Sequence, residues 1–171
     1  MSFIPEDRLG MGLVASMDVT NNMLLKTYRD SRSPLLKRAG AKAMALKLIQ
    51  RLNISTPGPG TPVRQLSGGN VQKVLLGREI ESGPRLLITA YAVRGLDTHS
   101  SFTIYDLLNR QKERGVGILF IGEDLDVLIE LCDRIMVLCR GECMGIVEAR
   151  GAGKEQLGLM MAGMRKEEMA A

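Results

Sequence analysis

One run of the chain, LSGGNVQK at residues 66–73, places small and polar residues directly before an apolar helical segment. Adjacent glycines let a ligand approach the backbone closely, and the first N–H groups of a helix have no partner within it. Those donors and the positive end of the helix dipole favour an anion, and the Ser67 hydroxyl adds another donor. An ordinary helix N-cap uses the same residue types. The run therefore indicates either a phosphate-facing helix start or a plain cap.

Alternating helical and strand patterns surround and follow this run. Their order predicts an α/β fold with a mainly parallel sheet, because buried apolar strands separated by helices pack in that way. The expected helices cover residues 69–82, 98–114, 124–132 and 153–164. The expected strands are 86–90 and 116–121, followed by a terminal hairpin of 134–139 and 142–147.

A Pro/Gly-rich stretch at residues 57–62 divides the chain, because it supports neither a helix nor a strand interior. Everything before it is expected to be helical, with helices at 21–28 and 34–52. We therefore expect residues 1–62 to form a helical subdomain with its lead-in, and residues 63–171 to contain the sheet.

Composition places the chain among globular proteins. Of its 171 residues, 45% are hydrophobic, which is enough for a core and excludes a disordered chain. No apolar run approaches the roughly 20 residues of a membrane-spanning helix, and the first residues lack the layout of a signal peptide. With only three cysteines, the simplest expectation is a reduced, cytosolic setting.

Positive charge is concentrated in one segment. The chain carries a formal net charge of +4, and residues 26–51 contain many Lys and Arg side chains against a single acid, Asp30. This pattern is typical of a solvated helix face. It is equally compatible with a surface that faces the phosphates of a nucleic acid or of a membrane leaflet.

Two kinds of site are not expected. Cys139 and Cys143 lie four residues apart, but no second Cys/His pair accompanies them, and tetrahedral zinc needs four ligands or three plus water, so no metal site is predicted. A phosphate-cradling G-x-x-x-x-G-K-[ST] loop does not occur in the sequence.

The single histidine, His99, is expected to be an exposed residue at a helix N-terminus.

The order of motifs resembles the second half of an ATP-binding cassette (ABC) nucleotide-binding domain. Residues 66–72 resemble the signature loop, and Gly95-Leu96-Asp97 resembles the D-loop. The PEDR run at residues 5–8 resembles the second cassette of the tandem ATPases that drive simple-sugar and nucleoside importers. The likeness covers about residues 4–163. It implies a partial P-loop NTPase fold, with a helical subdomain followed by a mainly parallel sheet and without the phosphate-loop half.

The resemblance also implies roles for individual residues. In the family each nucleotide lies between two cassettes, and the signature loop of one covers the ATP held by the other. Ser67, Gly68, Gly69 and Gln72 would then contact ATP bound to a partner cassette, and Asp97 would cross the interface near the same nucleotide. The implied cofactor is ATP with Mg²⁺, held mainly by the partner. No catalytic residue is assigned to this chain.

Three positions depart from the family pattern. The magnesium-associated aspartate falls on Ala90, the general-base glutamate on Tyr91 and the switch histidine on Glu123. Methyl and phenol groups cannot replace carboxylates that orient Mg²⁺ and water, and a glutamate would place negative charge near a triphosphate. The chain's own site is therefore expected to be inactive, while its signature loop is intact.

These implications define an expected function. The chain is expected to be part of the ATP-binding subunit of an importer for simple sugars or nucleosides. Its partners would be a second cassette, membrane permease subunits and, indirectly, a substrate-binding protein, with the chain held at the cytoplasmic face of the membrane by the permease.

Two alternatives remain open at this stage. One is a truncated, poorly soluble cassette with no independent function. The other is a non-transport ABC ATPase that binds DNA; the PEDR run at residues 5–8 and the absence of coiled-coil heptads argue against it, so nucleic acid is not an expected partner.

Overall fold

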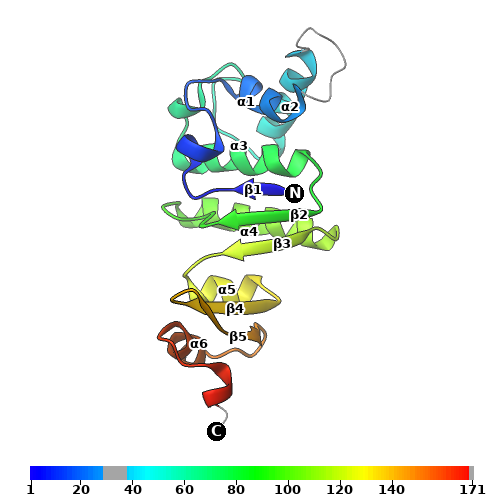
Figure 1. The fold of residues 1–171 in the computed structure, drawn as a ribbon. Coiled ribbons are helices and arrows are strands. Elements are labelled where there is room, and N and C mark those ends of the chain that lie inside the picture. Colours follow the sequence, from blue (N-terminus) through cyan, green and yellow to red (C-terminus); the bar gives the residue numbers. More distant parts are fainter. Residues whose placement is uncertain (29–37, 170–171) are drawn as a thin grey trace. The chain divides into compact units, whose positions relative to one another are not determined.

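The computed structural model describes residues 1–28 and 38–169 (Figure 1). The chain divides into two compact units, residues 1–121 and 122–171, and each is described by itself. The division expected after residue 62 falls inside the first unit and stays a prediction. None of the helices within the described residues combines the length and apolar content needed to cross a membrane.

The first unit is built on a three-stranded parallel sheet with the order β1-β2-β3. Strand β2 (Leu86–Ala90) has the predicted bounds, and β3 (Gly117–Ile121) lies within the predicted range. Strand β1 (Ser2–Ile4) was not expected, so the prediction that everything before the Pro/Gly stretch is helical is wrong there. Three residues are too few to show a strand period, and β1 is defined by its pairing with β2.

Two helices cover one face of this sheet. Helix α3 (Gly68–Glu81) packs on β1, and α4 (Thr98–Glu113) packs on β3, close to the bounds expected for both. Ser2, Ile4 and Leu87 point to this face and are buried, and the Ser2 hydroxyl lies 3.3 Å from the Glu79 carbonyl oxygen of α3. The side chains that alternate with them point to the other face.

The other face of the sheet is apolar and open. Phe3, Leu86, Leu119 and Ile121 lie on it, and each has between 38 and 45% of its surface exposed. Strands alternate their side chains between faces, so both faces of this sheet are hydrophobic although the described residues cover only one.

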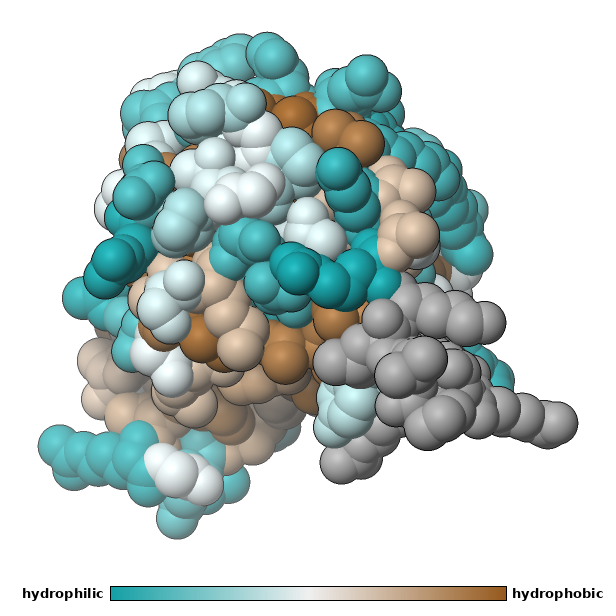
Figure 2. Space-filling model, turned by 90° about the horizontal axis from the view of Figure 1, so that it is seen from above, coloured by the Kyte–Doolittle hydropathy of each residue, from teal (hydrophilic) through white to brown (hydrophobic). Residues whose placement is uncertain are grey.

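The helical part of the first unit consists of α1 (Val19–Thr27) and α2 (Arg38–Arg51), near the helices expected at 21–28 and 34–52. Residues 34–37 of the second prediction lie outside the described residues. The Pro/Gly stretch packs back on α1, because the Val19 N–H donates to the Thr61 carbonyl and the Thr20 N–H to the Pro59 carbonyl. Seen from above in Figure 2, this end of the molecule is largely hydrophilic, with small hydrophobic patches between polar side chains.

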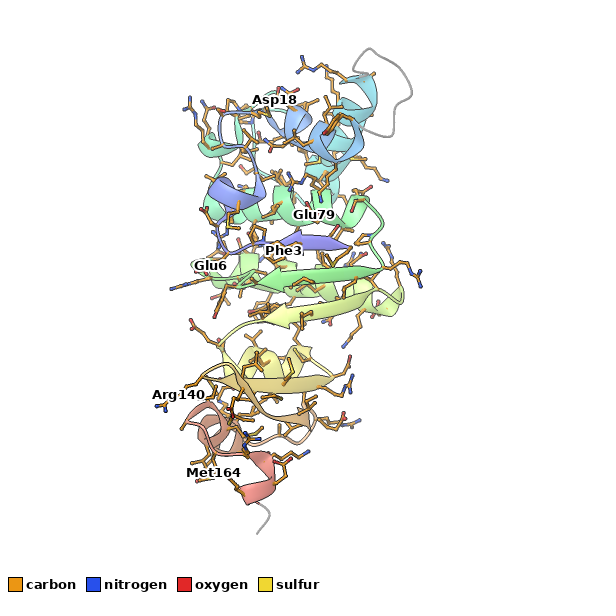
Figure 3. All side chains as sticks on the ribbon, viewed as in Figure 1. Phe3, Glu6, Asp18, Glu79, Arg140 and Met164 are labelled. Atoms are coloured by element: carbon orange, nitrogen blue, oxygen red, sulfur yellow. The ribbon has the colours of Figure 1, made fainter. Side chains whose placement is uncertain are left out.

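A buried charge network ties these parts together. Glu79 on α3 lies above β1 (Figure 3), and its carboxylate contacts Lys26 of α1 at 2.7 Å and Arg78 at 2.8 Å. Arg78 also donates to the Gly12 carbonyl at 2.7 Å. Gly12 belongs to the short π-helical turn η1 (Arg8–Gly12), which leads from β1 toward α1.

The second unit contains α5 (Leu125–Leu131), the antiparallel strands β4 (Arg134–Cys139) and β5 (Glu142–Glu148), and α6 (Lys154–Met161). All four were expected at nearly these bounds. Two single turns of 3-10 helix, η3 (Val63–Gln65) and η4 (Lys166–Met169), complete the described elements. The hairpin and α6 share a hydrophobic core that includes Val137, Leu157 and Met160.

Candidate functional site

The start of α3 lacks the side-chain cap that other helices of the chain have. Ser67 is the N-cap residue. Its hydroxyl accepts a hydrogen bond of 2.9 Å from the side-chain amide of Asn70, and it accepts none from a backbone N–H. At the starts of α1 and α4, by contrast, Asp18 and Asp97 each accept a backbone N–H. The first N–H groups of α3 are therefore available to an outside acceptor, because nothing in the helix itself pairs them.

Small residues bring the starts of α3 and α4 together. A Cβ atom on Gly69 would lie 2.6 Å from the Ser100 Oγ atom, so any larger residue would require the Ser100 side chain to move. Asp97 stands at the same place, 2.9 Å from the Ser100 N–H that it accepts. The two loops expected to act together, around Ser67 and around Asp97, are thus neighbours in the fold.

Hydrogen bonds hold the Asp97 carboxylate at this position. The Ser100 N–H and the Ser100 hydroxyl, at 2.9 and 2.7 Å, both donate to it and lower its pKa below the usual range of an aspartate. Asp97 is exposed to solvent. It remains an anion and an acceptor at the surface, beside the uncapped start of α3.

Arg8 adds a cation that the motifs did not point out. A Cβ atom on Gly68 would lie 3.5 Å from the Arg8 Nη1 atom, so the guanidinium lies beside the exposed start of α3. Arg8 also donates to the Arg94 carbonyl, and partial burial lowers its pKa. No local pattern indicates this proximity, because Arg8 and Gly68 are brought together by the packing of α3 against β1 and η1.

Gln72 lies in a different environment from the rest of the signature-like run. Ser67 and Gly68 are exposed, whereas the Gln72 side chain is fully buried. Its amide nitrogen and oxygen have no hydrogen-bond partner among the described residues. The structure therefore groups Ser67, Gly68 and Gly69 with Asp97 at one surface and leaves Gln72 inside, and the expected contact of Gln72 with a nucleotide stays a prediction.

The positions that carry carboxylates in the family lie at the end of β2. Ala90 is the last residue of the strand, and Tyr91 follows it in the left-handed region with φ of 50°. The Tyr91 N–H donates to the Ile121 carbonyl at 2.9 Å, and the Arg94 guanidinium lies 5.8 Å from the centre of the Tyr91 ring. Glu123 is exposed in the second unit. Neither Ala90 nor Tyr91 carries a carboxylate.

Metal-ligating side chains do not gather elsewhere in the described part of the chain. No group of three or more His, Cys, Asp or Glu side chains is close enough there to hold a metal ion. Within the same described residues, Cys132, Cys139 and Cys143 form no disulfide bond.

Part of the basic segment is neutralised by ion pairs. Lys26 pairs with Glu79, and Arg51 pairs with Glu81 at 2.5 Å. Lys42 and Lys47 on α2 are exposed. Arg29, Arg32 and Lys37 lie outside the described residues.

Comparison with known proteins identifies relatives along nearly the whole chain, although no family model matches it. The guanosine import ATP-binding protein NupO of Bacillus subtilis is 35% identical over 168 residues, covering 96% of this chain and 33% of that protein. The xylose import ATP-binding protein XylG of Moorella thermoacetica is 34% identical over 157 residues, covering 92% and 31%. The ribose import ATP-binding protein RbsA 1 of Rubrobacter xylanophilus is 36% identical over 167 residues, covering 95% and 33%. The chain spans about a third of the length of these curated relatives.

Solved structures confirm the predicted fold. A dimeric ATP-binding cassette in a post-hydrolysis state, bound to ADP and Pi, superposes with a TM-score of 0.73 at 21% identity, covering 88% of this chain and 63% of that chain. An ATP binding subunit of an ABC transporter gives the same TM-score at 20% identity, covering 94% and 68%. The α/β architecture is therefore that of part of an ATP-binding cassette.

Proposed function

We propose a role for this chain from one premise: over more than nine-tenths of its length it is a homologue of the ATP-binding proteins of sugar and nucleoside importers, with the fold of part of an ATP-binding cassette. In this role Ser67, Gly68 and Gly69 face ATP and Mg²⁺ that a second cassette holds. The chain thereby couples ATP binding to the import of a simple sugar or nucleoside.

The observation that carries the proposal is the exposed, uncapped start of α3. Its free N–H groups and the positive end of a 14-residue helix can stabilise the negative charge of a terminal phosphate. Arg8 beside Gly68 adds positive charge, and Gly69 lets this surface approach a ligand closely. Asp97 lies next to Gly69, and we propose that it meets the partner near the same nucleotide.

The chain's own nucleotide site is proposed to be inactive. Ala90 offers no ligand for Mg²⁺, and the Tyr91 phenol cannot act as the carboxylate base that orients water. The contact between the Arg94 guanidinium and the Tyr91 ring supports a packing role for Tyr91. Together with an intact start of α3, these residues favour a chain that completes another cassette's site and does not hydrolyse ATP alone.

The remaining partners follow from the same proposal. We propose that the helical part, α1 and α2, docks on membrane permease subunits at the cytoplasmic face of the membrane, and that a substrate-binding protein acts through the permease. The exposed Lys42 and Lys47 of α2 support a location near anionic lipid headgroups.

A chimera tests this function. The aligned third of the Bacillus subtilis guanosine import ATP-binding protein is replaced by this chain, and ATP hydrolysis is measured with the purified chimera. We expect turnover that Ser67→Arg lowers by about tenfold or more, because a bulky side chain blocks the start of α3. Gln50→Arg is the control, since Gln50 is exposed and its neighbour Arg51 pairs with Glu81 at the opposite end of α3.

Two results would contradict the proposal. One is a chimera in which Ser67→Arg and Gln50→Arg have the same turnover. The other is magnesium-dependent ATP hydrolysis by this chain alone, because that would assign the catalytic groups to its own residues.

A further inference from the structure

A hollow of about 220 Å³ opens between three helices of the first unit. The end of α2 forms one wall, α3 contributes Lys73 and Ile80, and α4 forms the longest wall, from His99 to Arg114. All of its lining residues belong to this one unit. The hollow is therefore a feature of the first unit by itself.

The lining of the hollow is strongly basic. Its charged members, apart from His99, are Arg51, Lys73, Asp106, Arg110 and Arg114. Arg110 pairs with Asp106 at 2.8 Å, and Arg51 pairs with Glu81 at 2.5 Å. Within the described part of the chain, Lys73 and Arg114 form no ion pair with a carboxylate. An excess of positive charge thus faces the hollow.

Among the residues that line the hollow, Lys73 is the cation that an anion would stabilise most. Only 8% of the residue is exposed, and its ammonium makes one long hydrogen bond, 3.4 Å, to the Asn53 carbonyl. An ammonium group has three N–H donors. A buried charge with one weak acceptor is costly, and an anion in the hollow would satisfy the remaining donors.

The uncharged polar groups and the volume of the hollow restrict the chemistry and the size of a ligand that can bind there. Thr103 and the buried Gln111 side chain face the same space and can bond to ligand hydroxyls. A volume of 220 Å³ is below the roughly 300–1,000 Å³ of pockets for drug-sized molecules. The ligand that fits is a small anion with hydroxyl groups and no large apolar part.

We propose that this hollow binds a phosphate group, either free or carried by a small sugar phosphate, with Lys73 and Arg114 as its cationic ligands. The site goes beyond the proposed function, because none of Ser67, Gly68 or Asp97 lines it. A ligand there contacts α2, α3 and α4 together, and so stabilises the packing of the helical part on the rest of the unit.

Calorimetric and thermal titration of the full chain test the site. Inorganic phosphate and a hexose phosphate are the probes, with the neutral hexose and sodium chloride at equal ionic strength as references. We expect saturable binding of at least one phosphate probe and a rise in unfolding temperature, because a ligand that binds only the folded state stabilises it. Tighter binding of the hexose phosphate would identify the larger ligand, and equal binding would identify the phosphate group alone.

Variants separate this site from general attraction to a basic protein. Lys73→Met and Arg114→Gln should each raise the dissociation constant about tenfold or more, because each removes charge-assisted hydrogen bonds to the phosphate. Lys42→Gln is the control, because Lys42 is an exposed cation outside the hollow. Because Arg114 is exposed, Arg114→Gln should keep the fold. It therefore still tests the site if Lys73→Met unfolds the chain.

Three outcomes would overturn the inference. They are no saturable binding of either phosphate probe at millimolar concentration, equal weakening in Arg114→Gln and Lys42→Gln, and equal stabilisation by the neutral hexose. If the chain self-associates, the same titration is carried out on the chimera that contains it. The ATP hydrolysis test uses other residues, so the two proposals fail independently.

Discussion

The two faces of the sheet in the first unit have similar side chains but opposite surroundings. On one face Ile4 and Leu87 are fully buried beneath helices, while on the other Leu119 and Ile121 are 45 and 40% exposed. Parallel strands with apolar residues on both faces are typical of sheets that are covered on both sides. Cohesion within the described part of this unit therefore comes mainly from one face, and the exposed apolar surface of the other face favours association with other molecules.

The largest effect should come from matched truncations on the two faces. Leu87→Ala leaves a cavity beneath the helices and should lower the free energy of unfolding by about 2–5 kcal/mol. Leu119→Ala removes the same atoms from a half-open position, so its cost should stay below about 1 kcal/mol. Urea denaturation followed by circular dichroism measures both. Equal losses would mean that the open face is covered in solution.

Charge on the open face should change association more than stability. Leu119→Lys combined with Ile121→Lys breaks the apolar strip, and we expect less self-association by light scattering and sedimentation. The free energy of unfolding should change by less than about 1 kcal/mol, because neither side chain fills a closed core. Met136→Lys, on an exposed position of β4 in the second unit, is the control. Unchanged association in the double variant alongside a strong effect of Met136→Lys would assign self-association to the second unit.

The smallest change in the free energy of unfolding is expected at Asp97, which lies on neither face of the sheet. The Ser100 N–H and hydroxyl lower its folded-state pKa, so its contribution to stability is complete above the unfolded pKa of about 3.9. That contribution is lost as the pH falls through the lowered folded pKa. Asp97→Asn should therefore remove a small acid-dependent part of the stability, as seen in unfolding curves between pH 6 and 3. Identical curves for Asp97→Asn and the unsubstituted chain would contradict this cause of the shift.

Elements with a clear period and a clear end were predictable from sequence. Helix α3 ends before Gly83-Pro84, and the β4–β5 hairpin turns at Arg140-Gly141, where both residues have positive φ. Strand β1 was not predictable, because its three residues gain their structure from a partner far along the chain.

The candidate site was predictable in its motifs but not in its surroundings. Gly69 and Asp97 are neighbours in the fold, and the roles expected for their two loops toward a nucleotide stay a prediction. The burial of Gln72 and the position of Arg8 beside Gly68 depend on how α3 packs against β1, which no local pattern encodes. Side-chain environment at a helix start is a tertiary property, whereas the helix start itself is local.

The pairing of Ser2 with Leu87 has a consequence for how the protein is made. During synthesis β1 leaves the ribosome well before β2, because about 85 residues separate Ser2 from Leu87. Contacts between residues so distant in the chain slow folding, and the waiting segment is open to wrong partners in the meantime. A chaperone that binds nascent chains would therefore matter most while β1 waits for β2.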